Sequence, residues 1–428
     1  MNFASRLLQP RWRSAWTRFS RSGRCTPLLV GILCVFLVGA TLEFGHGHLH
    51  VLTEKINPPV AGPPPSSGPG GQNVLRLSRA ATSNGEEPEF LSVTLLPGRG
   101  MNVFQLVARI PGQGDVALLA SPPLAEGASA LNGQANDSGS ADQTTPGAFL
   151  MLPWARRLTG TSVAAPGGGD ALVQAEWQGQ TLRVPSDPPG SNTSVEGLLQ
   201  QLASDSLQTE VLRDGQSAQA VYHPASVAGQ WPSSLEVTVQ VELEAQELDL
   251  TMTTKNTGNQ PMPLGAGWQP AFALPTGSRS RVMLAIPSTT VTEVDPATAR
   301  PTGRTLSVAH TPLDFSSPGG TILGNGAINQ TYTDLQAAPT GTVADLCDPS
   351  IDLLLRLVAL TPNISSLHVV APSDRAWVSI SPNTNLDDPL GPEWTQHPSG
   401  LVTLAPGETT QWKVRLQMAR LSTLGEPK

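Results

Sequence analysis

Residues 235–254 read LEVTVQVELEAQELDLTMTT, which is the clearest secondary-structure pattern in the chain. From Leu235 to Leu243 every second residue is apolar, as in a strand with one buried and one solvent-facing side. After a short polar connection, EAQE, the alternation resumes over Leu248–Thr254. Two alternating runs joined in this way predict a β-hairpin.

Similar strand-like runs recur along the chain, with turn residues between them. The 428 residues include 41 Gly and 40 Pro, and only 5% are aromatic. Repeated strands without alternating helices predict an all-β fold in which two sheets pack face to face. We expect one large β-sandwich domain over residues 74–422 and a short tail, 423–428. The other strand-like runs are Glu89–Leu96, Val103–Ile110, Ala171–Trp177, Arg281–Ala285, Ile351–Leu360, Leu367–Ala371, Ala376–Ile380 and Thr409–Met418.

Two segments inside this domain have no hydrophobic period. Residues 121–146 and 164–170 are rich in small and polar residues, and we expect disordered insertions or flaps there. The domain has a single cysteine, Cys347, which we interpret as a small buried apolar residue. The chain has no Cys-x-x-Cys and no His-Glu-x-x-His motif, and we predict no metal and no cofactor.

The charge is unevenly distributed along the chain. The formal net charge is −8, yet residues 1–24 hold six Arg and no acidic residue. The rest of the chain is therefore distinctly acidic. An acidic body does not suit binding to a phosphate backbone, so we predict no nucleic-acid partner.

An uncharged segment follows this basic tail. Residues 25–43 begin with 18 uncharged residues, and a bilayer-spanning helix needs about 20 apolar ones. Because basic residues stay on the cytoplasmic side, we expect a type II single-pass membrane protein with a lumenal or extracellular body. A secreted protein with a cleaved signal, or an organellar protein, is the alternative. Residues 44–73 form a Pro/Gly-rich linker, in which His46, His48 and His50 alternate.

A second informative stretch is Gly267–Pro275, GWQPAFALP. Together with seven other segments, and in the same order, it resembles the aldose 1-epimerase (galactose mutarotase-like) family across residues 74–422. The resemblance implies a galactose mutarotase-like supersandwich and a sugar or other polar small molecule as ligand. The other segments are LPGRGMNV (96–103), GAFLMLPWARRL (147–158), VEGLL (195–199), TPLDF (311–315), INQTY (328–332), SPNT (381–384) and LAPGET (404–409).

Anomer exchange needs a base for the C1 hydroxyl and an acid for the ring oxygen. In the family a Glu is the base, a His is the acid, a second His assists, and Arg and Asp hold hydroxyl groups. The resemblance places Gln269 at the acid position, Glu196 at the second His, Ser381 at the base and Asn329 at the Asp, while Arg157 is retained.

This mapping leaves no intact catalytic set, since Gln269 and Ser381 have no proton to exchange near neutral pH. Glu196 could act alone as a base, and Asp387, Asp388 or Glu393 could supply another. The implied substrate-binding residues are Arg157, Glu196, Trp268, Gln269 and Asn329.

Three functions remain open from the sequence. The first is a membrane-tethered, carbohydrate-binding domain with lost or much-reduced mutarotase activity. The second is an active aldose 1-epimerase with rearranged acid and base residues. The third is a structural or interaction domain that keeps only the fold, because a fold alone does not determine a function.

Overall fold

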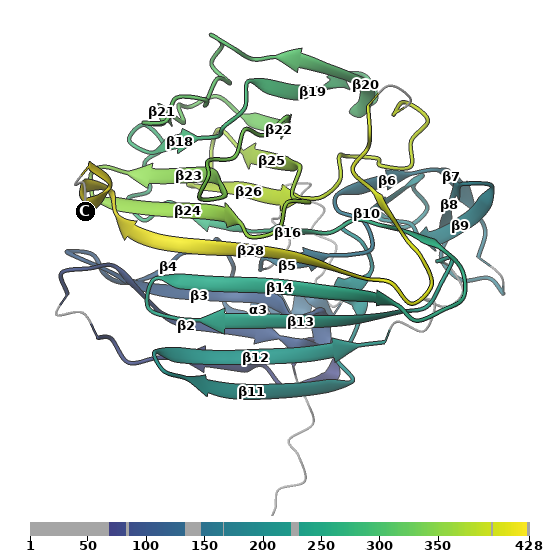
Figure 1. Cartoon of the computed structure of the whole chain (residues 1–428), viewed down its shortest axis with the longest axis horizontal. Coiled ribbons are helices and arrows are strands. Elements are labelled where there is room, and N and C mark those ends of the chain that lie inside the picture. The colour runs from purple at the N-terminus through teal and green to yellow at the C-terminus, as the bar shows by residue number, and fades with distance from the viewer. Residues whose placement is uncertain are drawn as a thin grey trace, which may run out of the picture. The chain divides into compact units, whose positions relative to one another are not determined.

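The hairpin predicted from residues 235–254 is confirmed, and it lies within a nine-stranded antiparallel sheet in the computed structural model (Figure 1). Its strands are β13 (Leu235–Leu243) and β14 (Glu247–Asn256). Buried residues alternate strictly with half-buried ones along β13, so the apolar side of the strand faces the core. The sequence pattern therefore sets both the strand and the direction that its side chains face.

The structure describes residues 68–82, 85–132, 147–165, 167–223, 231–394 and 397–425. The expected basic tail, the segment 25–43 and the linker up to residue 67 lie outside them.

The nine-stranded sheet forms one layer of the fold. All its neighbouring strands are antiparallel, and β11 and β21 are its edges. Across the sheet the strands are β11 (Ser206–Leu212), β12 (Gly215–Tyr222), β13, β14, β28 (Thr409–Arg420), β24 (Leu353–Ala359), β23 (Thr342–Asp348), β18 (Met283–Ala285) and β21 (Thr321–Ile322).

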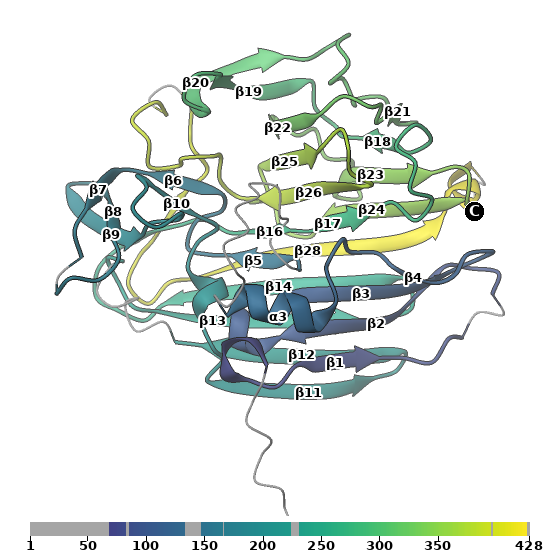
Figure 2. The same ribbon diagram turned by 180° about the vertical axis from the view of Figure 1, so that it is seen from behind.

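The second layer consists of an eight-stranded and a four-stranded sheet, seen in front in Figure 2. A bridge between Val103 and Ala148 connects them. The eight-stranded sheet runs β20 (Arg300–Ser307), β19 (Thr290–Asp295), β22 (Ile328–Thr333), β25 (Ser366–Ala371), β26 (Trp377–Asn383), β16 (Gly267–Gln269) and β5 (Phe149–Met151), with β17 (Ala271–Ala273) also on β26. The four-stranded sheet runs β1 (Leu75–Ser78), β2 (Glu89–Leu96), β3 (Asn102–Ile110) and β4 (Gly114–Ala117).

Smaller elements complete the fold. The described residues also form one three-stranded sheet, two strand pairs and one α-helix, α3 (Leu124–Leu131), which lies within the first expected insertion. That part of the insertion is helical, while residues 133–146 lie outside the described ones. The small sheets are β7 (Thr161–Val163), β8 (Leu172–Trp177) and β9 (Gln180–Pro185); β10 (Thr193–Val195) with β6 (Arg157–Thr159); and β15 (Met262–Leu264) with β27 (Val402–Leu404). The 3-10 turns are η1 (Pro69–Gly71), η2 (Pro97–Arg99), η3 (Leu199–Gln201) and η5 (Leu421–Gly425).

The inward faces of the two layers share one hydrophobic core. It includes the alternate residues of β13 together with side chains of β2, β3, β25 and β26. Trp154 and Trp231 stack in this core with ring centroids 5.3 Å apart. The all-β sandwich predicted from the sequence is thus present, with two layers packed on one core.

The expected type II single-pass placement is contradicted. No helix among the described residues is long and apolar enough to cross a membrane. Helix α3 has 8 residues, which is about 12 Å of helix, against about 30 Å for a bilayer core.

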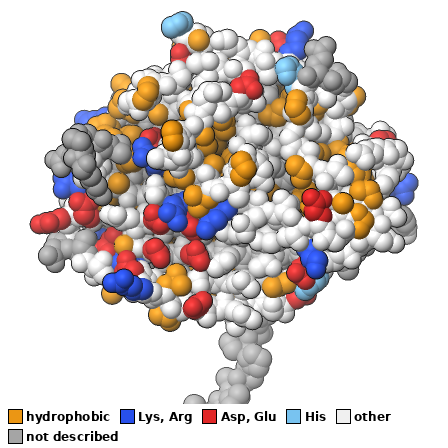
Figure 3. All heavy atoms as spheres, viewed as in Figure 1, with side chains coloured by type: hydrophobic (Ala, Val, Ile, Leu, Met, Phe, Trp, Pro, Cys, Tyr) orange, Lys and Arg blue, Asp and Glu red, His pale blue; other side chains and the backbone are white. Residues whose placement is uncertain are grey.

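The outer surface mixes charges of both signs. Figure 3 shows acidic and basic side chains side by side on the face of the nine-stranded sheet. On β14 and β28, for example, Asp249 pairs with Lys413 at 3.1 Å and with Arg415 at 2.6 Å.

Candidate functional site

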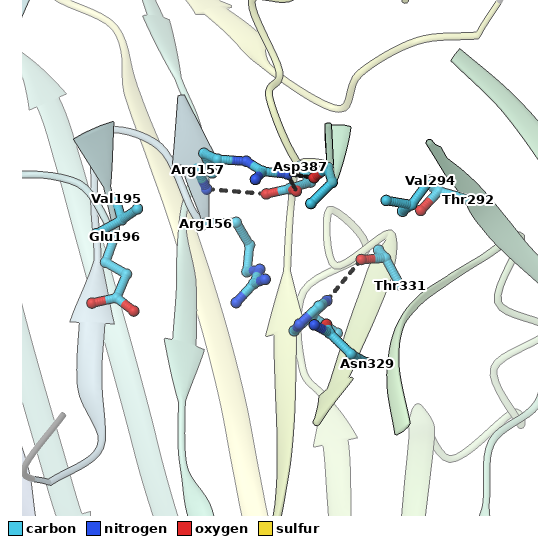
Figure 4. Close-up of a pocket in the computed structure, with 11 residues that line it drawn as sticks. Arg156, Arg157, Val195, Glu196, Thr292, Val294, Asn329, Thr331 and Asp387 are labelled. Atoms are coloured by element: carbon cyan, nitrogen blue, oxygen red, sulfur yellow. Dashed lines mark hydrogen bonds and ion pairs between the residues drawn. The ribbon is translucent and has the colours of Figure 1, made fainter. Parts of the chain in front are cut away.

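A pocket of about 240 Å³ lies between the β6–β10 pair and the face of the eight-stranded sheet (Figure 4). Three parts of the chain form its wall: β6 and β10, strands β19, β22 and β25, and the loop that follows β26. Its polar and charged side chains include Arg156, Arg157, Glu196, Asn329, His368 and Asp387. Three of these, Arg157, Glu196 and Asn329, belong to the site predicted from the sequence.

Arg157 begins β6 and is fixed by the loop after β26. Its Nη2 pairs with Oδ2 of Asp387 at 2.8 Å, and its backbone N–H donates to Oδ1 of the same carboxylate at 3.1 Å. The guanidinium also donates to the Ala299 carbonyl, between β19 and β20. Asp387 therefore holds Arg157 in place at the pocket and neutralises its charge.

Two residues at the pocket have left-handed backbone conformations. Arg156 has φ 68° and Glu196 has φ 66°, a region that residues other than glycine seldom adopt. The Glu196 N–H donates to the Arg156 carbonyl at 2.6 Å. Backbone strain of this kind persists only where the surrounding structure stabilises it, and such positions concentrate at functional sites.

Glu196 and Gln269, both predicted site residues, contact each other. Nε2 of Gln269, at the end of β16, donates to Oε1 of Glu196 at 3.2 Å. Burial raises the pKa of the Glu196 carboxyl to about 7, against the lowering effects of the Arg156 charge and the Gln269 hydrogen bond. The carboxyl is therefore partly protonated near neutral pH and can both donate and accept.

His368 lies on β25 at the pocket floor and is 5% exposed. Its Nδ1 shares a hydrogen bond with Oγ1 of Thr331 at 2.8 Å, and its Nε2 has no partner among the described residues. Burial lowers the pKa of His368 well below its usual value, and the charges of Arg156 and Arg157 act in the same direction. The imidazole is therefore neutral at physiological pH.

Ser381 lies beside this histidine. Thr331, His368 and Ser381 are directly opposite one another on β22, β25 and β26, so their side chains share one face of the sheet. Ser381 is fully buried, and its hydroxyl oxygen has no partner among the described residues. Ser381 thus lies next to a residue of the pocket floor but is not among the residues that line the pocket.

Trp268 lies in the core and does not line the pocket. It is fully buried, its indole N–H donates to the Ala148 carbonyl at 3.1 Å, and its ring meets Phe272 edge-on. Successive side chains of a strand point to opposite faces, so Trp268 and Gln269 cannot both face the pocket. Gln269 does not line the pocket either, and it reaches the site only through its hydrogen bond to Glu196.

Many buried polar atoms around the pocket have no partner. Across a folded protein nearly all such atoms are hydrogen-bonded, so a cluster of exceptions calls for a ligand or another explanation. Within the described residues the unpartnered atoms near the pocket are Nε of Arg156, Nε of Arg157, Oε1 of Gln269, Nε2 of His368 and Oγ of Ser381. Arg156, Arg157 and His368 line the cavity, and with the Glu196 carboxyl they place donors and acceptors around it.

Two of these residues were not assigned to the site from the sequence. His223, which precedes a proline in the sequence, is exposed and pairs with Asp205 and Glu236 away from the pocket lining. His368 is the only ionisable residue in its strand, β25. This feature of the sequence could have identified it as a candidate site residue. Arg156 is visible in the sequence only as a neighbour of Arg157.

Solved structures of similar proteins share this fold. A galactose mutarotase-like protein from Clostridium acetobutylicum matches with a TM-score of 0.61 and 15% identity, over 81% of this chain and 98% of that one. An aldose epimerase homologue from C. elegans matches with a TM-score of 0.58 and 14% identity, over 81% and 99%. A galactose 1-epimerase from Lactobacillus acidophilus matches with a TM-score of 0.57 and 13% identity, over 81% and 99%.

The sequence itself also matches a family model. No curated protein sequence matches the chain significantly. The model described as aldose 1-epimerase matches residues 174–417, more than half of the chain, and this segment includes Glu196, Gln269, Asn329, His368 and Ser381. The chain therefore belongs to the aldose 1-epimerase family.

Proposed function

We propose that this protein binds a carbohydrate in the pocket beside β6 and that its anomer-exchange activity is lost or much reduced. The single observation that supports the proposal is that Gln269 and Ser381 stand in the sequence where the motif resemblance puts the family's acid and base. Neither side chain exchanges a proton near neutral pH, and Ser381 is buried beside His368.

The sugar would be held by groups that suit hydroxyls. Arg157 is fixed by Asp387, so little side-chain entropy is lost when it binds a ligand. Asn329 is exposed at the pocket and offers both an amide donor and a carbonyl acceptor. Glu196 completes the set, because its partly protonated carboxyl can meet a hydroxyl in either role.

Two measurements on the full-length protein test the proposal. Calorimetry with glucose and galactose should detect binding that Arg157→Ala abolishes and that Arg183→Ala, on exposed β9, leaves unchanged. Polarimetry should show anomer exchange no faster than in buffer. The absence of any binding would refute the proposed carbohydrate binding. Anomer exchange faster than in buffer would refute the proposed loss of activity.

One observation favours a second candidate, an aldose 1-epimerase with rearranged groups. Glu196 and His368 line the same pocket, one with a pKa of about 7 and the other a neutral imidazole with an unpartnered Nε2. The Glu196 carboxylate would take the proton of the C1 hydroxyl, while Nε2–H of the neutral His368 would donate a hydrogen bond to the ring oxygen, which takes a proton from water as the bond between C1 and the ring oxygen breaks. Rotation about the C1–C2 bond and reclosure in reverse would give the other anomer and return both protons.

The same polarimetric assay separates the two candidates. An active enzyme should lose at least a hundredfold in rate with either Glu196→Gln or His368→Gln, since the first group takes the proton and the second stabilises the charge that develops on the ring oxygen. Its rate should increase as the pH rises through about 7, because the base must be ionised. A rate that neither substitution changes would exclude this pair as the acid and base.

A further inference from the structure

Arg156 differs from other arginines that are packed into the fold, because its guanidinium has no partner. It makes no ion pair or side-chain hydrogen bond with the described residues, and its Nε is buried without an acceptor. Figure 4 shows its side chain extending into the pocket, between Glu196 on one side and Asn329 on the other. By contrast, Arg79 pairs with Glu89, Arg356 with Asp345 and Arg415 with Asp249.

The position of this guanidinium is set by the backbone. Arg156 has φ 68°, and its carbonyl accepts the Glu196 N–H at 2.6 Å. A strained conformation that directs an unpaired cation into a cavity is stable only if the rest of the fold maintains it. Arg156 and Arg157 are adjacent in the sequence and both line the pocket, so two guanidinium groups lie at it.

The neighbouring acidic groups compensate this charge only in part, and neither forms an ion pair with Arg156 within the described residues. Arg157 already has its counter-ion, Asp387, at 2.8 Å. Glu196 makes no ion pair within the described part of the chain, and burial keeps its carboxyl partly protonated by raising its pKa to about 7. Burial lowers the pKa of Arg156, and the nearby charges of Asp387 and Glu196 offset this effect only in part.

We propose that the ligand of this pocket is a monosaccharide that carries an anionic group, a carboxylate or a phosphate, and that Arg156 binds this group. The inference rests on the proposed carbohydrate-binding function and adds the charge class of the sugar. A guanidinium is suited to this role because its planar fork donates two parallel hydrogen bonds to either anion. A pocket of about 240 Å³ is small for a ligand site, which suits one sugar ring.

Calorimetry on the full-length protein at constant ionic strength tests the charge class. The probes are galactose and glucose, the matched galacturonate and glucuronate, glucose 6-phosphate, and inorganic phosphate alone. We expect one anionic sugar to bind at least tenfold more tightly than its neutral counterpart. The uronates and the sugar phosphate distinguish a carboxylate from a phosphate, and binding of inorganic phosphate as tight as that of the sugar phosphate would show a general anion site and overturn the proposal.

Three variants connect the preference to Arg156. Arg156→Gln should make neutral and anionic sugars bind equally, while Arg156→Lys should keep part of the preference. Arg183→Gln removes one exposed positive charge on β9 and should change nothing, which controls for net charge. A preference that persists in Arg156→Gln would overturn the role of this residue.

The outcomes separate this inference from the function on which it rests. Neutral and anionic sugars binding equally to the unmodified protein would overturn the inference and leave carbohydrate binding intact. Binding of none of the sugars would overturn both. The comparison within the unmodified protein decides the charge class even if Arg156→Gln fails to fold.

Discussion

Gln269 donates a hydrogen bond to Glu196 at 3.2 Å, so the end of β16 contacts a carboxyl group that lines the pocket. The donor favours the ionised carboxylate, while burial favours the protonated acid and raises its pKa to about 7. Gln269 thus limits how far the pKa of its neighbour rises.

Gln269→Leu should therefore raise the pKa of Glu196 further. The leucine removes the donor and adds apolar surface beside the carboxyl, and both changes disfavour the charged form. Carbon-detected NMR titration of the glutamate side chains would measure the shift. Gln240→Leu is the control. Gln240 donates to Glu242 at 2.8 Å within β13, so its substitution should leave the pKa of Glu196 unaffected. An unchanged or lower pKa in Gln269→Leu would contradict the role assigned to the amide.

Glu196 and His368 should give opposite pH dependences of stability. The folded-state pKa of Glu196 is raised, so its contribution is fully present below the unfolded value of about 4.5 and is lost as the pH rises through about 7. The folded-state pKa of His368 is lowered, so its contribution is present above about 6.5 and is lost as the pH falls. Between pH 4.5 and 6.5 the two effects partly cancel.

Substitution of either residue should reveal the pH dependence of stability that the other residue causes. In Glu196→Gln the free energy of unfolding should increase with pH over this window. In His368→Gln it should decrease by up to about 3 kcal/mol between pH 4 and 8, at 1.36 kcal/mol per pKa unit. Urea unfolding at a series of pH values measures both slopes. Equal slopes in the two variants would show that at least one group has an ordinary pKa in the folded protein.

Much of the fold could be predicted because its long strands have a clear period. Strand β2 begins and ends at the predicted residues, and β13 with β14 forms the predicted hairpin. Strands such as β5 and β16 have three residues, too few to show a period, and they depend on pairing with distant segments. Their existence follows from tertiary contacts that no local pattern records.

Residues of the candidate site could be predicted from the sequence where they belong to a recognisable motif. Motif order placed Arg157, Glu196 and Asn329, and all three line one pocket. The partners of Arg156 and His368 are set by distant segments, so neither the unpaired guanidinium nor the Thr331 bond could be read from the sequence. Trp268 illustrates the reverse, because the alternation of strand side chains already excludes it once its neighbour faces the pocket.

Trp268→Phe should affect stability and leave ligand affinity unchanged. The substitution removes a buried hydrogen bond to Ala148 and leaves a cavity in the core, at a cost of about 1–3 kcal/mol. Urea unfolding would measure the loss, and calorimetry with the tightest-binding sugar should give a dissociation constant within twofold of the unmodified protein. A tenfold weaker affinity in a folded variant would show that Trp268 contributes to sugar binding after all.

Gly197→Ala should destabilise the protein much more than Gly179→Ala. Both glycines have positive φ, 71° and 78°, so an alanine at either position is strained by about 1–2 kcal/mol. At Gly179, in the turn between β8 and β9, a Cβ would meet nothing within 4 Å. At Gly197 it would lie 2.4 Å from the Leu152 carbonyl oxygen, so the backbone beside Glu196 must shift.

We expect a difference of at least about 2 kcal/mol in the free energy of unfolding between the two variants, measured with urea, which is the range for overpacking a rigid site. Sugar affinity should fall only in Gly197→Ala, because that shift displaces Glu196 from Gln269. Equal effects of the two substitutions would show that the turn at Gly197 is not constrained by its contact with Leu152.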